Sequence, residues 1–303
     1  MSRILVTGAS GFVGRVLVPT LVSEGYDVRA AVRRLPAPFE PPVEPATHDD
    51  LSADVEWQPL LAGVDFVVHL AGIAHTGGVS DVHYDRINHR ATAALAAAAR
   101  AAGVKRLVFV STIRAQTGPR SDRVLTEADA PRPTDPYGRS KLAAETALAQ
   151  SRVDFTVLRP VLVYGPGVKG NLRALMRLAA LPVPLPFGAF TNRRSLLSVH
   201  NLVAAIVHVL RHAASGRETY VVADPQPVSL AEIVTALRAG MDRAPGLFTV
   251  PPALLHLGLT LLGRGGNWDQ IDGQLIVDPS KLIAAGWRPE VDTAAGLAAM
   301  AGK

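Results

Sequence analysis

The sequence predicts an α/β fold with a doubly wound, Rossmann-type parallel sheet and a smaller, discontinuous C-terminal domain. Its first half alternates short, nearly continuous apolar runs with segments of helical periodicity, as expected for parallel strands that are buried on both faces. A glycine-rich loop follows the first apolar run. The chain has 303 residues, which is enough for one large α/β unit or two coupled domains.

The apolar runs of the first half are the predicted strands of this sheet. They are residues 4–6, 28–32, 66–70, 107–110 and 156–158. Helices are expected between them at residues 13–24, 91–102 and 141–149. Gly25 and Gly103 stand where a helix commonly ends in a left-handed glycine. The resulting βαβ order predicts strands that run parallel to one another.

The pattern changes after Pro160. Three prolines between residues 181 and 188 exclude a regular helix or a central strand there. Farther on, we expect a strand at 195–199, a helix at 201–211 and a strand at 220–223. The sequence therefore predicts two domains, a dinucleotide-binding domain of residues 1–164 and 197–224 and a substrate-binding domain of residues 165–196 and 225–303.

Composition limits the kinds of site and partner. The chain has no cysteine, so disulfides and thiolate metal sites are excluded, and its nine histidines show no metal-ligand spacing, so no metal is expected. The 31 basic and 26 acidic residues give a formal charge of +5, but they are scattered and do not predict a nucleic-acid partner. Binding of anionic small molecules would explain this excess of basic residues, and an Arg-rich composition without any partner would explain it equally well.

Two segments bear on membranes. The N-terminus enters a predicted strand directly and shows no signal-peptide pattern. Residues 247–263 are the most membrane-like, but Pro251 and Pro252 interrupt them and they fall short of the roughly 20 residues that span a bilayer. We expect a half-buried helix there, no membrane partner, and a cytoplasmic protein. The Ala-rich helix 91–102 is compatible with close packing inside the chain or across a homodimer.

The glycine-rich loop lies between the first strand and the first helix. Glycines 8, 11 and 14 form G-x-x-G-x-x-G, a variant of the dinucleotide fingerprint. Glycine permits the tight turn, and the N-terminus of the helix offers unpaired N–H groups and positive dipole to a pyrophosphate. The expected cofactor-binding residues of this loop are Gly8, Ser10, Gly11, Phe12, Val13 and Gly14.

The end of the second strand bears on the choice between NAD and NADP. An acidic residue there bonds the ribose 2′-hydroxyl of NAD, whereas arginine accepts the 2′-phosphate of NADP. The strand ends in Arg33 and Arg34 without an acidic residue. The sequence thus favours NADP(H) and leaves NAD(H) open.

The catalytic candidates are a tyrosine and a lysine four residues apart, Tyr137 and Lys141, on one face of the start of a helix. A neighbouring ammonium favours the phenolate and lowers a tyrosine pKa that is ordinarily near 10. Ser111 and Thr112 follow the strand at 107–110, at the carboxyl end where ligands bind in such sheets. A hydroxyl there can orient a substrate oxygen while Tyr137 exchanges a proton with it.

In these motifs the chain resembles the extended short-chain dehydrogenases/reductases, the NAD-dependent epimerase/dehydratase family. The resemblance covers nearly the whole chain. It is carried by residues 4–14, 68–72, 88, 110–112, 137–141, 159–160 and 163–166. It implies catalytic roles for Thr112, Tyr137 and Lys141, and cofactor contacts for Asp50 and Leu51 by the adenine and for Leu70, Ala71 and Gly72 after the fourth strand.

Residues 193–202 are similar to the nucleotide-sugar subgroup, especially to enzymes that act at C4 of a UDP-sugar. This implies that Arg194 contacts the diphosphate of a substrate and that Asn171 also contacts the substrate. The dehydratases of the family carry Asp-Glu after the catalytic Thr, where this chain has Ile113 and Arg114. Many nucleotide-sugar members also carry an Arg before a late strand, but none stands between residues 270 and 277 here.

We therefore expect an oxidoreductase that acts at C4 of a nucleotide-activated sugar. Reduction of a 4-keto sugar is favoured, because Arg33 suits an exchangeable NADPH, with a UDP-hexose 4-epimerase as the alternative. A third hypothesis is a non-catalytic NAD(P)-binding sensor or scaffold. The joint presence of Thr112, Tyr137 and Lys141 speaks against it, because a sensor has no need for a proton-transfer set.

Overall fold

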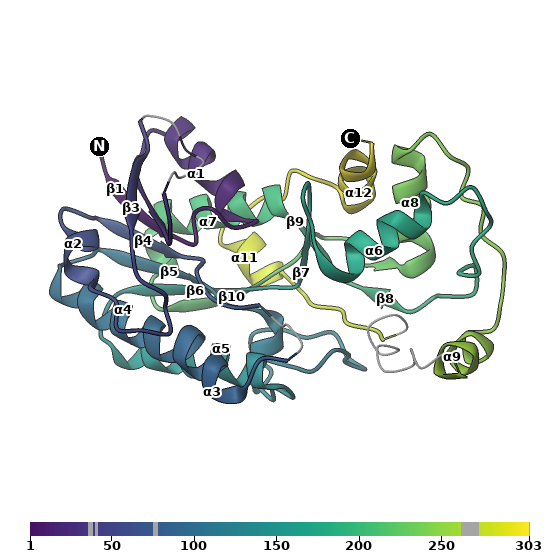
Figure 1. The fold of residues 1–303 in the computed structure, drawn as a ribbon, viewed down its shortest axis with the longest axis horizontal. Coiled ribbons are helices and arrows are strands. Elements are labelled where there is room, and N and C mark those ends of the chain that lie inside the picture. Colours follow the sequence, from purple (N-terminus) through teal and green to yellow (C-terminus); the bar gives the residue numbers. More distant parts are fainter. Residues whose placement is uncertain (36–38, 40–41, 75–77, 262–272, 303) are drawn as a thin grey trace.

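The computed structural model describes the chain except residues 36–38, 40–41, 75–77, 262–272 and 303 (Figure 1). Its centre is a seven-stranded sheet of order β10-β6-β5-β4-β1-β2-β3, in which every neighbouring pair is parallel. The strands are β1 (Arg3–Thr7), β2 (Asp27–Val32), β3 (Glu44–Thr47), β4 (Phe66–His69), β5 (Arg106–Val110), β6 (Phe155–Pro160) and β10 (Glu218–Val222). The predicted fold class is confirmed.

Helices cover both faces of the sheet because successive residues of each strand point to opposite sides. Ile4 and Val6 of β1 belong to the core beneath α1 (Gly14–Ser23) and α7 (Val199–Arg211). Leu5 belongs to the core on the other face. That face carries α2 (Trp57–Leu61), α4 (Ala91–Ala101) and α5 (Pro136–Gln150), with α3 (Asp81–Tyr84) and the π-helical turn η1 (Asp85–Arg90) beside them.

The helix ends at Gly25 and Gly103 are confirmed. Both glycines have left-handed backbone, with φ of +83° and +73°. The residue after each glycine donates its N–H back into the last turn, from Tyr26 to the carbonyl of Leu21 and from Val104 to Ala99, both at 3.0 Å. These bonds satisfy carbonyls that the helix end leaves open.

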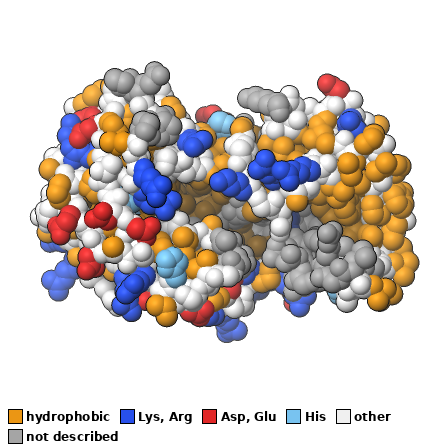
Figure 2. All heavy atoms as spheres, viewed as in Figure 1, with side chains coloured by type: hydrophobic (Ala, Val, Ile, Leu, Met, Phe, Trp, Pro, Cys, Tyr) orange, Lys and Arg blue, Asp and Glu red, His pale blue; other side chains and the backbone are white. Residues whose placement is uncertain are grey.

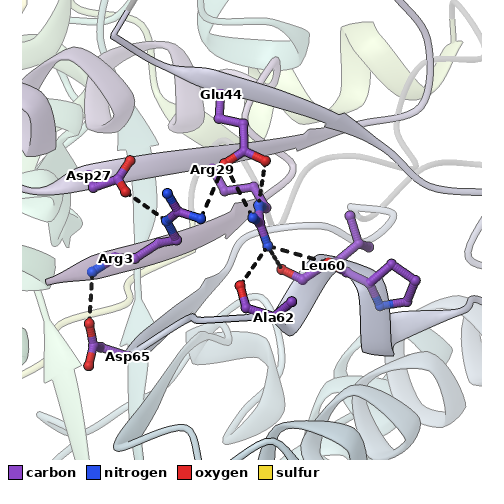
Figure 3. Close-up of polar contacts among 8 residues, drawn as sticks. Arg3, Asp27, Arg29, Glu44, Leu60, Ala62 and Asp65 are labelled. Carbon is purple, nitrogen blue, oxygen red and sulfur yellow. Dashed lines mark hydrogen bonds and ion pairs between the residues drawn. The ribbon is translucent and has the colours of Figure 1, made fainter.

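Strand β3 was missed because it lacks an apolar run. Its Glu44 accepts hydrogen bonds from the buried guanidinium of Arg29 on β2, at 3.0 and 3.2 Å, and also pairs with Arg3 at 3.5 Å (Figure 3). Arg29 donates further to the carbonyls of Leu60 and Ala62. Ion pairs with Arg29 and Arg3, rather than burial of apolar side chains, therefore hold this edge strand against β2.

Helix α5 begins at Pro136, five residues before the start predicted at Lys141. Asp135 is its N-cap and Pro136 occupies the first turn, both favoured at those positions. This correction places Tyr137 inside the first turn of the helix.

A smaller part, formed by segments after residue 160, has its own core. Its strand pairs join β7 (Leu162–Tyr164) to β9 (Leu196–Ser198) and β8 (Arg193–Arg194) to β11 (Val228–Ser229). Its main helices are α6 (Gly170–Ala179), α8 (Leu230–Gly240) and α12 (Thr293–Ala301). Outside this smaller part, the turn η2 (Ile113–Ala115) follows β5, the turn η3 (Ala213–Ser215) follows α7, and α11 (Ser280–Ala284) packs against β10. The face in Figure 2 is hollowed between this part and the large sheet.

The predicted helix in 247–263 is present as α9 (Pro252–Leu261), but it is not half-buried. Leu254, Leu257 and Leu261 are 60%, 57% and 80% exposed. Residues 262 and 263 lie outside the described ranges. No helix of the described chain is long and apolar enough to cross a membrane.

Candidate active site

The expected cofactor loops meet where the strand order reverses, between β1 and β4. From β1 the chain proceeds outward through β2 and β3, and from β4 it proceeds the other way through β5 and β6. Gly8 has φ of +68°, and a Cβ there would lie 2.8 Å from the backbone nitrogen of Ala71. The loop after β1 therefore packs directly on residues 70–72 after β4, at the edge of the sheet where ligands bind in such folds.

The N-terminus of α1 fits the phosphates of a dinucleotide. Its first turn carries no acidic residue, and no side chain caps it. Among the described residues, none accepts a hydrogen bond from the N–H of Phe12 or Val13. These open donors and the helix dipole favour an anion. The aromatic side chain of Phe12 packs against the core of the smaller part, and the carbonyl of Ser10 accepts from Arg15.

Arg33 and Asp50 face each other beyond the ends of β2 and β3. Arg33 Nη1 lies 3.5 Å from Asp50 Oδ2, and both side chains are at least half exposed. Hydrogen bonds from Ser52, with Arg33 nearby, lower the pKa of Asp50. Leu51 is buried and Arg34 is exposed. Arg33, which the sequence predicts to bind the 2′-phosphate of NADP, is therefore already paired with a carboxylate.

Thr112 and Tyr137 come together from two elements. Thr112 caps η2 directly after β5, and its side chain shares a hydrogen bond with that of Tyr137 on α5. Burial raises the pKa of Tyr137 to about 12, while the bond to Thr112 acts in the opposite direction. The phenol is thus protonated at neutral pH in the protein alone, ready to donate to an oxygen.

Lys141 lies one helical turn after Tyr137 and is buried. Its ammonium donates to the carbonyl of Val110 at 2.8 Å and sits 4.0 Å from the ring centroid of Phe109. Burial lowers its pKa to about 7, partly opposed by Glu145. A lysine with so strongly lowered a pKa, one helical turn from a tyrosine, is typical of a catalytic site.

Ser111 does not join Thr112. Its hydroxyl donates to Glu145 at 2.5 Å, inside a buried network in which Arg159 binds both Glu145 and Gln116. The structure thus separates the two neighbouring hydroxyls, so that Thr112 contacts Tyr137 and Ser111 anchors α5 to the sheet.

Two buried side chains that we did not predict as site residues support these loops. Asn88, on the π-helical turn η1, binds both backbone groups of Ile73 and donates to Ser140 of α5. His69 contacts Thr7 at 2.6 Å through Nδ1, and burial lowers its pKa to about 3. The available signal was the family resemblance, which residues 68–72 and 88 help to carry.

The predicted substrate residues lie in the smaller part. Arg194, on β8, is partly buried, which lowers its pKa, and it donates to the carbonyl of Gly273 at 2.6 Å. Within the described chain no carboxylate pairs with it. Its neighbour Arg193 instead pairs with Glu232 at 2.6 Å. Asn171 is exposed at the start of α6. In the family's late-arginine region, residues 270–272 lie outside the described residues.

Fold and site together define a dinucleotide-binding enzyme of the short-chain dehydrogenase type. Residues 4–223 match the NAD dependent epimerase/dehydratase family, and the chain belongs to that family. No three His, Asp or Glu side chains of the described residues gather so that they could hold a metal ion.

Particular relatives are similar over nearly the whole chain. A UDP-glucose 4-epimerase of Vibrio cholerae is 36% identical over 94% of this chain and 90% of its own. A ceramide reductase of Caulobacter vibrioides is 30% identical over 84% of this chain and 76% of its own. The solved structure of MoeE5 in complex with UDP-glucuronic acid and NAD is 27% identical, with a TM-score of 0.78 over 98% of this chain and 97% of that one.

Proposed function

We propose that this chain is an NAD-dependent 4-epimerase of a UDP-hexose. The observation that carries the proposal is the hydrogen-bonded pair Thr112–Tyr137, with Lys141 one turn away, at the same edge of the sheet as an open phosphate-binding loop. The 36% identity to a UDP-glucose 4-epimerase over 94% of the chain supports C4 of a nucleotide sugar as the reacting centre. The comparisons thus favour the epimerase alternative over the 4-keto reductase that the sequence favoured.

The proton chemistry follows from the two hydroxyls. Bound NAD would accept the hydride from C4 and return it to the opposite face of the sugar. In its phenolate form, Tyr137 takes the proton of the 4-hydroxyl as the C4–O bond becomes a carbonyl, and the resulting phenol returns that proton to the oxygen when C4 is reduced. Thr112 orients the oxygen by a second hydrogen bond. We propose Lys141, one helical turn from Tyr137, as the cation that favours the phenolate when its amine is protonated.

The proposed cofactor is NAD rather than NADP. The residues that would hold it are those of the loop from Gly8 to Gly14, Asp50 and Leu51, and residues 70–72. Two observations favour NAD: Arg33 is paired with Asp50, and the MoeE5 structure carries NAD. An epimerase also has to retain its hydride between half-reactions, which suits a tightly held cofactor.

We assign the substrate diphosphate to Arg194, since guanidinium groups bind phosphates through charge-assisted hydrogen bonds. Asn171 is proposed as a second substrate contact. The proposed domains are residues 1–164 with 197–224 for the dinucleotide and 165–196 with 225–303 for the sugar nucleotide.

The test compares Tyr137→Phe with Tyr26→Phe, a matched change at the end of α1 away from the loops. With UDP-glucose as substrate, the wild type and Tyr26→Phe should form UDP-galactose with no net change in nicotinamide absorbance. NMR spectroscopy measures the formation of UDP-galactose. Tyr137→Phe should lose about 100-fold or more in kcat while binding NAD normally. Wild-type turnover by Tyr137→Phe would contradict the mechanism, and NADPH-dependent reduction of a UDP-4-keto-6-deoxyhexose without epimerisation would favour the reductase.

A further inference from the structure

Arg114 contacts both elements that carry the proposed catalytic hydroxyls. Its backbone N–H donates to Thr112 Oγ1 at 3.2 Å. Its guanidinium reaches across to the start of α5, where Nε donates to Asp135 Oδ2 at 3.1 Å and Nη2 donates to the same oxygen. One residue thus links the hydroxyl of Thr112 to the helix that holds Tyr137.

Asp135 divides its two carboxylate oxygens between two tasks. Oδ1 accepts from the N–H of Gly138 at 2.7 Å and caps α5, whereas Oδ2 accepts from Arg114. The side chains of Arg114 and Asp135 are only 20% and 14% exposed, so water screens this ion pair less than it screens one on the surface. The cap and the ion pair can therefore be removed separately.

Gly138 brings the two backbones into direct contact. A Cβ at this position would lie 2.2 Å from the carbonyl oxygen of Arg114, closer than any real contact. The first turn of α5 is consequently seated on η2 with no side chain between them. Because Tyr137 precedes Gly138 directly, a small shift of this seat moves the phenol relative to Thr112.

We infer that Arg114 is a positioning residue for the proton transfer, and that its ion pair with Asp135 holds α5 where Tyr137 and Thr112 share their hydrogen bond. The inference rests on the proposed function, since it assumes that these two hydroxyls handle the proton. Arg114 itself needs no contact with substrate. A misplacement of about 1 Å can cost on the order of 100-fold in rate, so a lost clamp should appear mainly in kcat.

Arg114 and Asp135 also shift the pKa of Tyr137 in opposite directions. Among the described residues, the groups that act on its phenol include Thr112 of η2, Tyr84 of α3, Asp135 at the helix start and Arg114. The charge of Arg114 lowers the pKa of Tyr137, and that of Asp135 raises it. Loss of Arg114 should shift the Tyr137 limb of the kcat profile to higher pH, and loss of the Asp135 charge should shift it to lower pH.

The experiment uses Arg114→Met, Asp135→Asn and the double variant, with Arg139→Met as control. The asparagine variant keeps the oxygen that caps α5, so the helix retains its cap. Its amide NH₂ group takes the place of Oδ2 and cannot accept a hydrogen bond from Arg114. Arg139 lies on the same helix and pairs with Asp81 at the surface, at 3.1 Å. Epimerisation of UDP-glucose is measured for kcat and KM across pH, together with NAD affinity and melting temperature.

We expect each single variant to lose about 10- to 100-fold in kcat, with KM and NAD affinity changed little. The double variant should be no slower than the worse single one, because both changes break the same contact. Arg139→Met should behave as wild type, and Arg114→Lys should recover part of the rate.

Single variants within twofold of wild type in kcat, or losses that multiply in the double variant, would overturn the inference. Equal pH shifts of the same sign in the two single variants would do so as well. If Tyr137→Phe itself keeps full turnover, the proposed function has failed instead, and the two failures are thereby distinguished.

Discussion

Arg159, buried between the sheet and α5, and Arg194, partly buried in the smaller part, differ in what surrounds their charge. Arg159 binds both oxygens of Glu145 on α5 and the amide oxygen of Gln116. Arg194 donates to the carbonyl of Gly273 and pairs with no carboxylate of the described residues. The charge of Arg159 is neutralised by Glu145 inside the protein, whereas the charge of Arg194, which we propose as the diphosphate contact, has no carboxylate partner among the described residues.

The strongest test of this contrast breaks the buried pair. Arg159→Met should lower the free energy of unfolding by about 3–5 kcal/mol, because it leaves the carboxylate of Glu145 buried and unpaired. Urea denaturation measures the change. The double variant Arg159→Met/Glu145→Met should recover much of the loss, since no uncompensated charge remains. A loss below about 1 kcal/mol in the single variant would show that the pair is not insulated from water.

The matched change at the other arginine should act on binding instead. Arg194→Met should weaken UDP binding about 10- to 100-fold, because one or more charge-assisted hydrogen bonds to the diphosphate are lost. Calorimetric titration with UDP gives the affinity, and the free energy of unfolding should stay within about 1 kcal/mol of wild type. Unchanged UDP affinity together with a large loss of stability would show that Arg194, like Arg159, stabilises the fold and does not bind the substrate.

The pH dependence of stability probes the charge next to Glu145. Burial lowers the pKa of Lys141 to about 7, against 10.5 for an ordinary lysine. Between these values the unfolded chain holds more protons than the folded one, so this group makes the free energy of unfolding rise with pH, and its contribution is lost as pH falls through 7. Denaturation across this window should show that rise in wild type relative to Lys141→Met. Parallel curves would mean that Lys141 titrates as it does in water.

The smallest effect is expected at the exposed pair Arg33–Asp50. Its two side chains are 72% and 50% exposed, so Arg33→Ala should change the free energy of unfolding by about 1 kcal/mol or less. NAD affinity should change by about fivefold or less for the same reason. A large loss of NAD affinity would instead indicate that Arg33 contacts the cofactor directly.

Short-range signals determined the cofactor end of the molecule. The glycine at residue 8, the helix ends at Gly25 and Gly103, and the one-turn spacing of Tyr137 and Lys141 each depend on a few neighbouring residues. Steric freedom of glycine and the period of a helix act over that range, so they are legible in the sequence. The start of α5 was predicted five residues too late, at Lys141, because the capping residue Asp135 and Pro136 in the first turn were not taken into account.

Only the tertiary structure decided which of two adjacent hydroxyls meets Tyr137 and which charges are neutralised. Ser111 and Thr112 are neighbours in sequence, yet one binds Glu145 and the other Tyr137. The partners of Arg29 and Arg114 lie 15 and 21 residues away, on elements whose approach depends on packing of the whole sheet. A charge carries no sequence signal of its partner, because Coulomb attraction selects whatever carboxylate the fold brings near.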